Sequence, residues 1–113
     1  MSILSKPSRK LASRIVNEVG FEDRIIGYRL RERTGPLAMT LYSFEEVVTF
    51  LRDPFPRINF QALQSWINDV MGDGELAEKV KTVIKEKPDG AERVQLVRDL
   101  MEERLGQSKG YGT

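Results

Sequence analysis

The chain has 113 residues, of which 40% are hydrophobic and 31% charged, a composition typical of one soluble globular domain. It has no cysteine, which excludes a disulfide scaffold, and no histidine, which removes the commonest general base and metal ligand. No apolar run reaches the roughly 18 residues of a membrane span, and the N-terminus lacks the charge pattern of a secretory signal. We therefore expect a cytoplasmic protein without a metal or cofactor.

Charge is distributed unevenly along the chain, although the net charge is only +1. Residues 1–33 carry eight lysines and arginines against four acids, whereas residues 34–113 carry ten against thirteen. Such a polarity can steer an anionic partner towards the N-terminal third of the chain. It can equally reflect two oppositely charged surfaces of one domain that attract each other. The sequence leaves both interpretations open.

The first third of the chain predicts a helix followed by a β-hairpin. Residues 8–19 have apolar side chains at helical spacing, and Gly20 is a typical helix stop. Residues 24–32 and 37–42 instead alternate in the manner of strands, and the glycine and proline between them are typical of a chain reversal. Because two strands alone are marginal in water, we expect this hairpin to lie against helices or to pair with something else.

Four further helices are predicted after the hairpin. Ser43 and Glu46 form a capping box at the start of the first of them, which ends before a two-proline connector, "DPFPR". The last helix spans residues 91–105 and is expected to end at Gly106. The predicted caps of the two helices between them are Asn59 and Asp73.

Together these elements predict an α+β fold. We expect an N-terminal helix, an antiparallel β-hairpin and then four helices packed on it as a single small domain over residues 1–106. Residues 107–113, "QSKGYGT", are small and polar and are predicted to form a flexible C-terminal tail. Phe60 and Trp66, the only tryptophan, are predicted to lie in the core.

Three arginines alternate along the first predicted strand and form the candidate site. Alternation places them on the face opposite Tyr28 and Leu30, about 7 Å apart by the rise of a strand. They predict either a basic binding surface or the solvent-exposed side of a hairpin, where long arginines also protect an edge. These arginines are Arg29, Arg31 and Arg33, and Phe55 in the proline connector would extend such a surface.

Two functions fit this surface, and a third lacks positive support. The first is a non-enzymatic binding module, an adaptor or accessory protein whose protein partner contacts the three arginines and Phe55. The second is a nucleic-acid-binding protein that also uses the first helix through Arg9, Lys10 and Arg14. An enzyme would have to work without histidine or cysteine, and no catalytic motif is found. A homodimer through an open hairpin edge is a further expectation.

Between residues 28 and 80, several short motifs follow one another in a distinctive order. They are Arg33-Thr34-Gly35, a "SFEE" helix start, Trp66-Ile67 with Asp69-Val70, and Gly72-Asp73 followed by Glu75-Leu76-Ala77. In this order they resemble a family of archaeal and bacterial proteins known only as a domain of unknown function. The resemblance implies a small α+β regulatory or accessory domain and names no activity. The family has histidines before the tryptophan helix, and since this chain has none, no role of theirs carries over.

Overall fold

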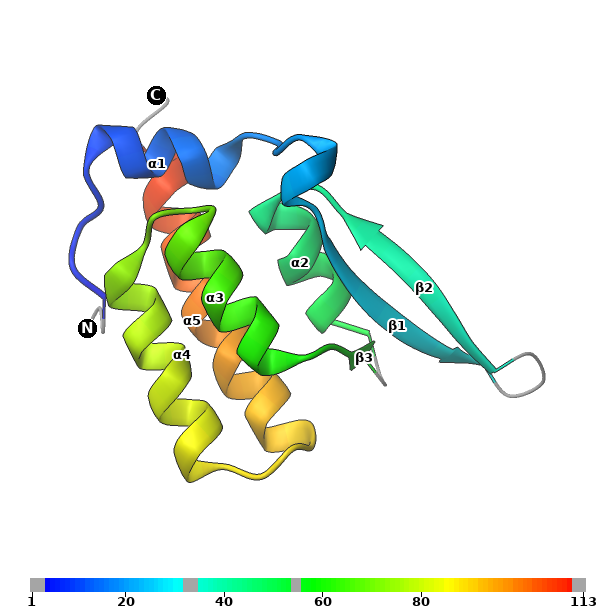
Figure 1. Ribbon diagram of the computed structural model, residues 1–113. Coiled ribbons are helices and arrows are strands. Elements are labelled where there is room, and N and C mark those ends of the chain that lie inside the picture. The colour runs from blue at the N-terminus through cyan, green and yellow to red at the C-terminus, as the bar shows by residue number, and fades with distance from the viewer. Residues whose placement is uncertain (1–3, 32–34, 54–55, 111–113) are drawn as a thin grey trace.

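The computed structural model describes residues 4–31, 35–53 and 56–110, where helices and a small antiparallel sheet make an α+β fold. Figure 1 shows the helices gathered together, with two long paired strands beside them that extend away from the helices. In chain order the elements are α1 (Arg9–Val16), the 3-10 helix η1 (Phe21–Asp23), β1 (Ile25–Arg31), β2 (Gly35–Leu41), α2 (Phe44–Leu51), β3 (Pro56–Arg57), α3 (Phe60–Asp69), α4 (Gly74–Glu86) and α5 (Ala91–Lys109).

The predicted helix caps are present and explain where the helices begin. Ser43 Oγ accepts a hydrogen bond from the N–H of Glu46 at 3.1 Å, and Asn59 Oδ1 accepts one from the N–H of Ala62 at 3.0 Å. The carboxylate of Glu46 returns to the backbone of Tyr42, one residue before the cap, at 2.9 Å. Ser43 therefore caps the helix as predicted, whereas Glu46 accepts from the amide of Tyr42 and not from the amide of the cap residue itself, so the capping box is formed only in part.

Helix α5 is the element around which the other helices pack. It contacts α1, α2 and α4, and α4 also contacts α3. The core between them contains fully buried Phe44, Val47 and Leu51 of α2. Trp66 is buried as well, and its Nε1 donates to the carbonyl oxygen of Asp23 at 2.7 Å, so the core position predicted for the tryptophan is confirmed.

The C-terminal end of α5 differs from the prediction. The helix does not stop at Gly106 but continues to Lys109, so residues 107–109 are helical rather than part of a flexible tail. Ser108 is buried and donates to the carbonyl oxygen of Arg104 at 2.8 Å, which shows that tertiary packing here outweighs the preference of glycine for a helix end. Residues 111–113 lie outside the described part. Although α5 has 19 residues, no helix in the described ranges is long and apolar enough to cross a membrane.

The sheet has a third strand that the sequence analysis did not predict. Residues Pro56 and Arg57 form β3 and pair antiparallel with Arg29 and Tyr28 of β1, so the strand order is β2-β1-β3. The expectation that both edges of the hairpin are open is therefore wrong on the β1 side. Proline is tolerated in an edge strand, which lets Pro56 pair with β1.

The face of the hairpin that carries Arg29 is turned towards α2. Gly27 shares this face with Arg29, and a Cβ atom added to Gly27 would lie only 2.5 Å from Cζ of Phe50, a buried residue of α2. Ile26 and Tyr28 of the opposite face are 39% and 45% exposed. Close approach of the strand to α2 thus uses this face for packing at Gly27, whereas the side chain of Arg29, farther along the same face, is still 43% exposed.

We expect Gly27→Val to lower the free energy of unfolding by about 1–3 kcal/mol, because the new side chain would overlap the ring of Phe50. Urea denaturation followed by circular dichroism measures this loss. Gly20→Ala is the matched control, since nothing lies within 4 Å of a Cβ atom at that position. Equal losses in the two variants would contradict the proposed contact.

Candidate functional site

Arg29 is engaged in an ion pair that joins the hairpin to the proline connector. Its Nε and Nη2 atoms both lie 2.8 Å from Oδ2 of Asp53, the residue two places after the end of α2. The two side chains are 43% and 23% exposed. Arg29 therefore positions the connector next to β1, and its charge is already matched by a carboxylate.

The other residues of the predicted surface fall into two groups, one outside the described residues and one on a different helix. The side chain of Arg31 and the whole of Arg33 and Phe55 lie outside the described residues. The basic residues of α1 are exposed, but this helix lies near the start of α2, whereas Arg29 lies near its end. Glu18, just after α1, forms an isolated antiparallel β-bridge with Ser43, the cap residue of α2. Arg29 is held beyond the end of α2, about 12 Å away by the rise of an eight-residue helix. The three residues of α1 are Arg9, Lys10 and Arg14.

A groove beside the connector brings together three other arginines from three different elements. It has a volume of about 630 Å³ and lies between the end of α2, β3 and the first turns of α5. Arg52 comes from the end of α2, Arg57 from β3 and Arg98 from α5. Apolar atoms of the lining come from Pro56, Ala91 and Val94. We call this the arginine groove.

The arginines of the groove are held only weakly by neighbouring acids. Arg52 Nε lies 2.9 Å from Oε1 of Glu102, but both side chains are well exposed, at 58% and 37%. Arg98 reaches Asp99 only at 4.0 Å. No carboxylate of the described residues lies within ion-pair distance of Arg57, which is exposed. Because exposed ion pairs contribute about 0–1 kcal/mol each, an incoming anion can replace them at little cost.

Two carboxylates also line the groove, and they set its net charge. Asp53 is matched by Arg29 from outside the groove, whereas Asp89 lies in the turn before α5. The cap residue of α5 is Gly90, which has no side chain to accept the free N–H groups of the first turn. The partial positive charge of this helix end adds to that of the arginines. The groove is therefore electropositive despite Asp89.

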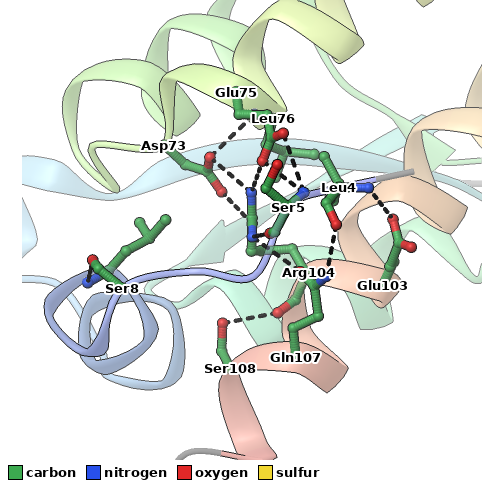
Figure 2. A network of polar contacts seen from close by, with 11 residues as sticks. Leu4, Ser5, Ser8, Asp73, Glu75, Leu76, Glu103, Arg104, Gln107 and Ser108 are labelled. Carbon is green, nitrogen blue, oxygen red and sulfur yellow. Dashed lines mark hydrogen bonds and ion pairs between the residues drawn. The ribbon is translucent and has the colours of Figure 1, made fainter. Parts of the chain in front are cut away.

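A second cluster of charges is buried and has a different character. Arg104 on α5 is 1% exposed, and Figure 2 shows its guanidinium at the centre of a polar network. Its Nε lies 2.7 Å from Oδ2 of Asp73, and its Nη2 lies 2.8 Å from Oε1 of Glu75. Its Nη1 donates to the carbonyl oxygen of Ser5 at 2.7 Å and to the side chain of Gln107 at 2.9 Å. With a further contact from Nη2 to Oδ1 of Asp73 at 3.4 Å, the five N–H donors of this arginine all find partners, on four residues in the N-terminal segment, at the start of α4 and in α5.

The N-terminal segment is tied down by the same network. Both carboxylate oxygens of Glu75 accept from the N–H of Ser5, at 3.0 and 3.1 Å. Gln107 Nε2 donates to the carbonyl oxygen of Leu4 at 3.0 Å, and the N–H of Leu4 donates to Glu103 at 3.2 Å (Figure 2). Among the described residues, no buried side-chain nitrogen or oxygen lacks a hydrogen-bond partner. The network therefore stabilises the fold and leaves no donor for a ligand.

Sequence reasoning identified parts of both clusters and missed the rest. Asp73 caps α4 as predicted, since its Oδ1 accepts from the N–H of Leu76 at 3.1 Å, but its ion pair with Arg104 was not predicted. A signal did exist: Arg104 falls on the buried stripe of α5 between Met101 and Ser108. For the arginine groove, the proline connector was recognised, whereas the convergence of arginines from α2, β3 and α5 has no counterpart in local sequence.

No protein-family model, curated protein or solved structure matches the chain. The resemblance of residues 28–80 to a domain of unknown function accordingly stays a prediction. The geometry of the arginine groove is what bears on function.

We expect Arg104→Ala to lower the free energy of unfolding by about 3–5 kcal/mol, because it leaves the carboxylate of Asp73 buried without its counter-ion. Arg52→Ala, which breaks the exposed pair with Glu102, is the matched control and is expected to cost less than about 1 kcal/mol. Chemical denaturation of the two variants measures both values. A small loss for Arg104→Ala would show that the buried pair is replaceable.

The network also predicts a pH dependence of stability. The pKa of Glu75 is lowered from its ordinary value of 4.5, chiefly because its carboxylate accepts from the backbone N–H of Ser5, and to a lesser extent because of Arg104. As the pH falls, the unfolded chain binds this proton first, so the stabilisation is complete above pH 4.5 and is lost as the pH drops through the lowered pKa.

We therefore expect the stability difference between the native chain and Glu75→Gln to be greatest at neutral pH and to vanish in acid. Urea midpoints measured from pH 7 down to pH 2.5 test this. Glu78→Gln is the control, because Glu78 is exposed on the same helix and forms no ion pair within the described ranges. A difference independent of pH would contradict the role assigned to the carboxylate.

Proposed function

We propose that this protein is a non-enzymatic binding module, a small cytoplasmic adaptor or accessory protein that holds an acidic segment of a protein partner in the arginine groove. The observation that carries the proposal is the convergence of Arg52, Arg57 and Arg98 from separate elements on one open groove of about 630 Å³. Arg57 has no carboxylate partner among the described residues, so its guanidinium is available to an anion.

The chemistry of the groove favours carboxylates on a peptide over a small rigid ligand. A guanidinium presents a planar fork of donors that matches a carboxylate with two hydrogen bonds. Apolar atoms of Pro56, Ala91 and Val94 offer a surface for the aliphatic stems of glutamate or aspartate side chains. The groove is open along its length, so an extended segment can lie in it and place acids at successive arginines.

Nucleic-acid binding remains the second candidate because of a separate observation on α1. This helix, "RKLASRIV", has Arg9, Lys10 and Arg14 exposed and contains no acid. A phosphate backbone could follow such a helix. The helix does not share a surface with the arginine groove, so variants can test the two candidates separately.

The first candidate predicts that a fluorescein-labelled peptide of ten glutamates binds the protein, and that Arg57→Ala with Arg98→Ala weakens binding at least about tenfold. Charge-assisted hydrogen bonds contribute about 1.5–3 kcal/mol each, and 1.4 kcal/mol is tenfold in affinity. The control is Arg9→Ala with Arg14→Ala, which removes the same charge from α1. Fluorescence anisotropy at fixed ionic strength measures all three proteins.

Two results would overturn the proposal. If both double variants weakened the peptide equally, binding would follow net charge rather than the groove. If a 20-nucleotide single strand bound more tightly than the peptide and only the α1 variant lost it, the nucleic-acid function would replace the first. A steep loss of affinity between about 50 and 200 mM salt would accompany that result.

A further inference from the structure

We propose that two copies of this chain associate through β2, whose free edge pairs antiparallel with the same strand of the second copy about a two-fold axis at Ala38. The three-stranded sheet then becomes a continuous sheet of six strands. This inference does not depend on the proposed function, because the edge of β2 and the arginine groove use different residues. Its support comes from the strand order, the composition of β2 and the distribution of charge along the hairpin.

Strand β2 forms one edge of the described sheet, since β1 lies between β2 and β3. The strand has seven residues, "GPLAMTL", and none of them is charged. Soluble proteins usually protect such an edge with charged side chains, proline or a covering segment, because its unpaired backbone groups attract another strand. Here Pro36 is the only such residue, and it lies near one end, so the rest of the strand is available for pairing.

Exposed apolar side chains are concentrated on the same hairpin. Of the large hydrophobic residues that are exposed in the described structure, Ile26, Tyr28 and Leu37 belong to β1 and β2, at 39%, 45% and 39% exposure. Tyr28 lies on the face opposite to Leu37 by the register of the two strands. A strand added beside β2 would cover Leu37 directly, whereas Ile26 and Tyr28 lie one strand farther from that edge.

The seven-residue strand is self-complementary about its central residue. An axis at Ala38 uses all seven positions and places Leu37 opposite Met39 of the second copy, with the two Ala38 residues facing each other. Small side chains meet at the axis, medium-sized apolar ones meet on either side, and no like charges are opposed. Any other register leaves part of the strand unpaired.

Charge along the hairpin favours the antiparallel arrangement. At the Leu41 end, Glu18, Glu45 and Glu46 line a cavity of about 420 Å³ together with Arg29 and residues of β2. A parallel pair would place these acidic ends of the two copies side by side, whereas antiparallel pairing keeps them apart. The separation of like charges therefore favours the antiparallel arrangement of two copies.

A single introduced cysteine tests the axis directly, because the chain has no cysteine of its own. In Ala38→Cys, the two sulfur atoms would belong to directly opposed residues, whose Cα atoms are about 4.5–5.5 Å apart in an antiparallel pair, a span that a disulfide fits. We expect mild oxidation to convert most of this variant to a covalent dimer on a non-reducing gel. Glu78→Cys, exposed on α4, is the control and is expected to remain a monomer.

The uncrosslinked protein supplies a second readout. Light scattering after size exclusion is expected to give twice the chain mass of 12.9 kDa for the native protein and a dissociation constant at least about tenfold higher for Ala38→Asp, which opposes two charges at the axis. Ala38→Thr keeps a strand-forming residue and is expected to remain dimeric. Circular dichroism of each variant verifies that it is folded.

The possible results separate the alternatives. A native chain that stays monomeric up to 1 mM would overturn the proposal, and so would a dimer that neither crosslinks at position 38 nor responds to Ala38→Asp. Crosslinking in a mixture of Leu37→Cys and Met39→Cys that exceeds that of either variant alone would establish the register. Dimers with the opposite preference would place the axis elsewhere and contradict it.

Discussion

The structure depends most on the buried ion pair between Arg104 and Asp73. Both side chains are only 1% exposed, so each charge requires the other. The pair joins the start of α4 to the last turns of α5, and through the carbonyl oxygen of Ser5 it also holds a segment 99 residues away in sequence. Hydrogen bonds around the same guanidinium keep α5 helical beyond Gly106. Arg104 thus links the start of α4, the end of α5 and the N-terminal segment at Ser5.

The Arg104 network and the arginine groove lie in different parts of the molecule. Polar groups of the Arg104 network are satisfied by protein atoms. The arginine groove lies at the C-terminal end of α2 and the N-terminal end of α5, where Arg52 and Arg98 form only exposed or distant ion pairs. Arg29 links the hairpin to this groove. Its ion pair with Asp53 holds the start of the connector, and Arg57 at the end of the connector lines the groove. Arginines of one chain therefore differ in role according to their burial and partners: Arg104 stabilises the fold, and the arginines of the groove are the ones that we propose for recognition.

The hairpin shows how packing changes the meaning of a sequence pattern. Alternation correctly separated Arg29 from Tyr28, but both interpretations of the sequence placed the arginine face in solvent. Gly27 lets β1 approach Phe50 closely, so this face packs against α2 at Gly27, while the side chain of Arg29 on the same face stays 43% exposed. The third strand then pairs with Tyr28 and Arg29 of β1, so that β2 and the two-residue β3 are the edge strands of the described sheet and β2 is the longer of the two. An edge without charges is the feature that sets the expected mode of self-association.

Local chemistry in the sequence determined the α+β class, the hairpin and the helix starts, because a cap such as Ser43 or Asn59 acts on an amide only three residues away. It could not determine which face of the hairpin packs, since the side-chain period of two is satisfied either way. The arginine groove and the Arg104 network depend on residues that are still farther apart in the sequence. Arg52, Arg57 and Arg98 become neighbours, and Arg104 meets Asp73, only when separate helices pack. The energy of burying a charge depends on the partner that tertiary structure provides, and no local pattern encodes that partner.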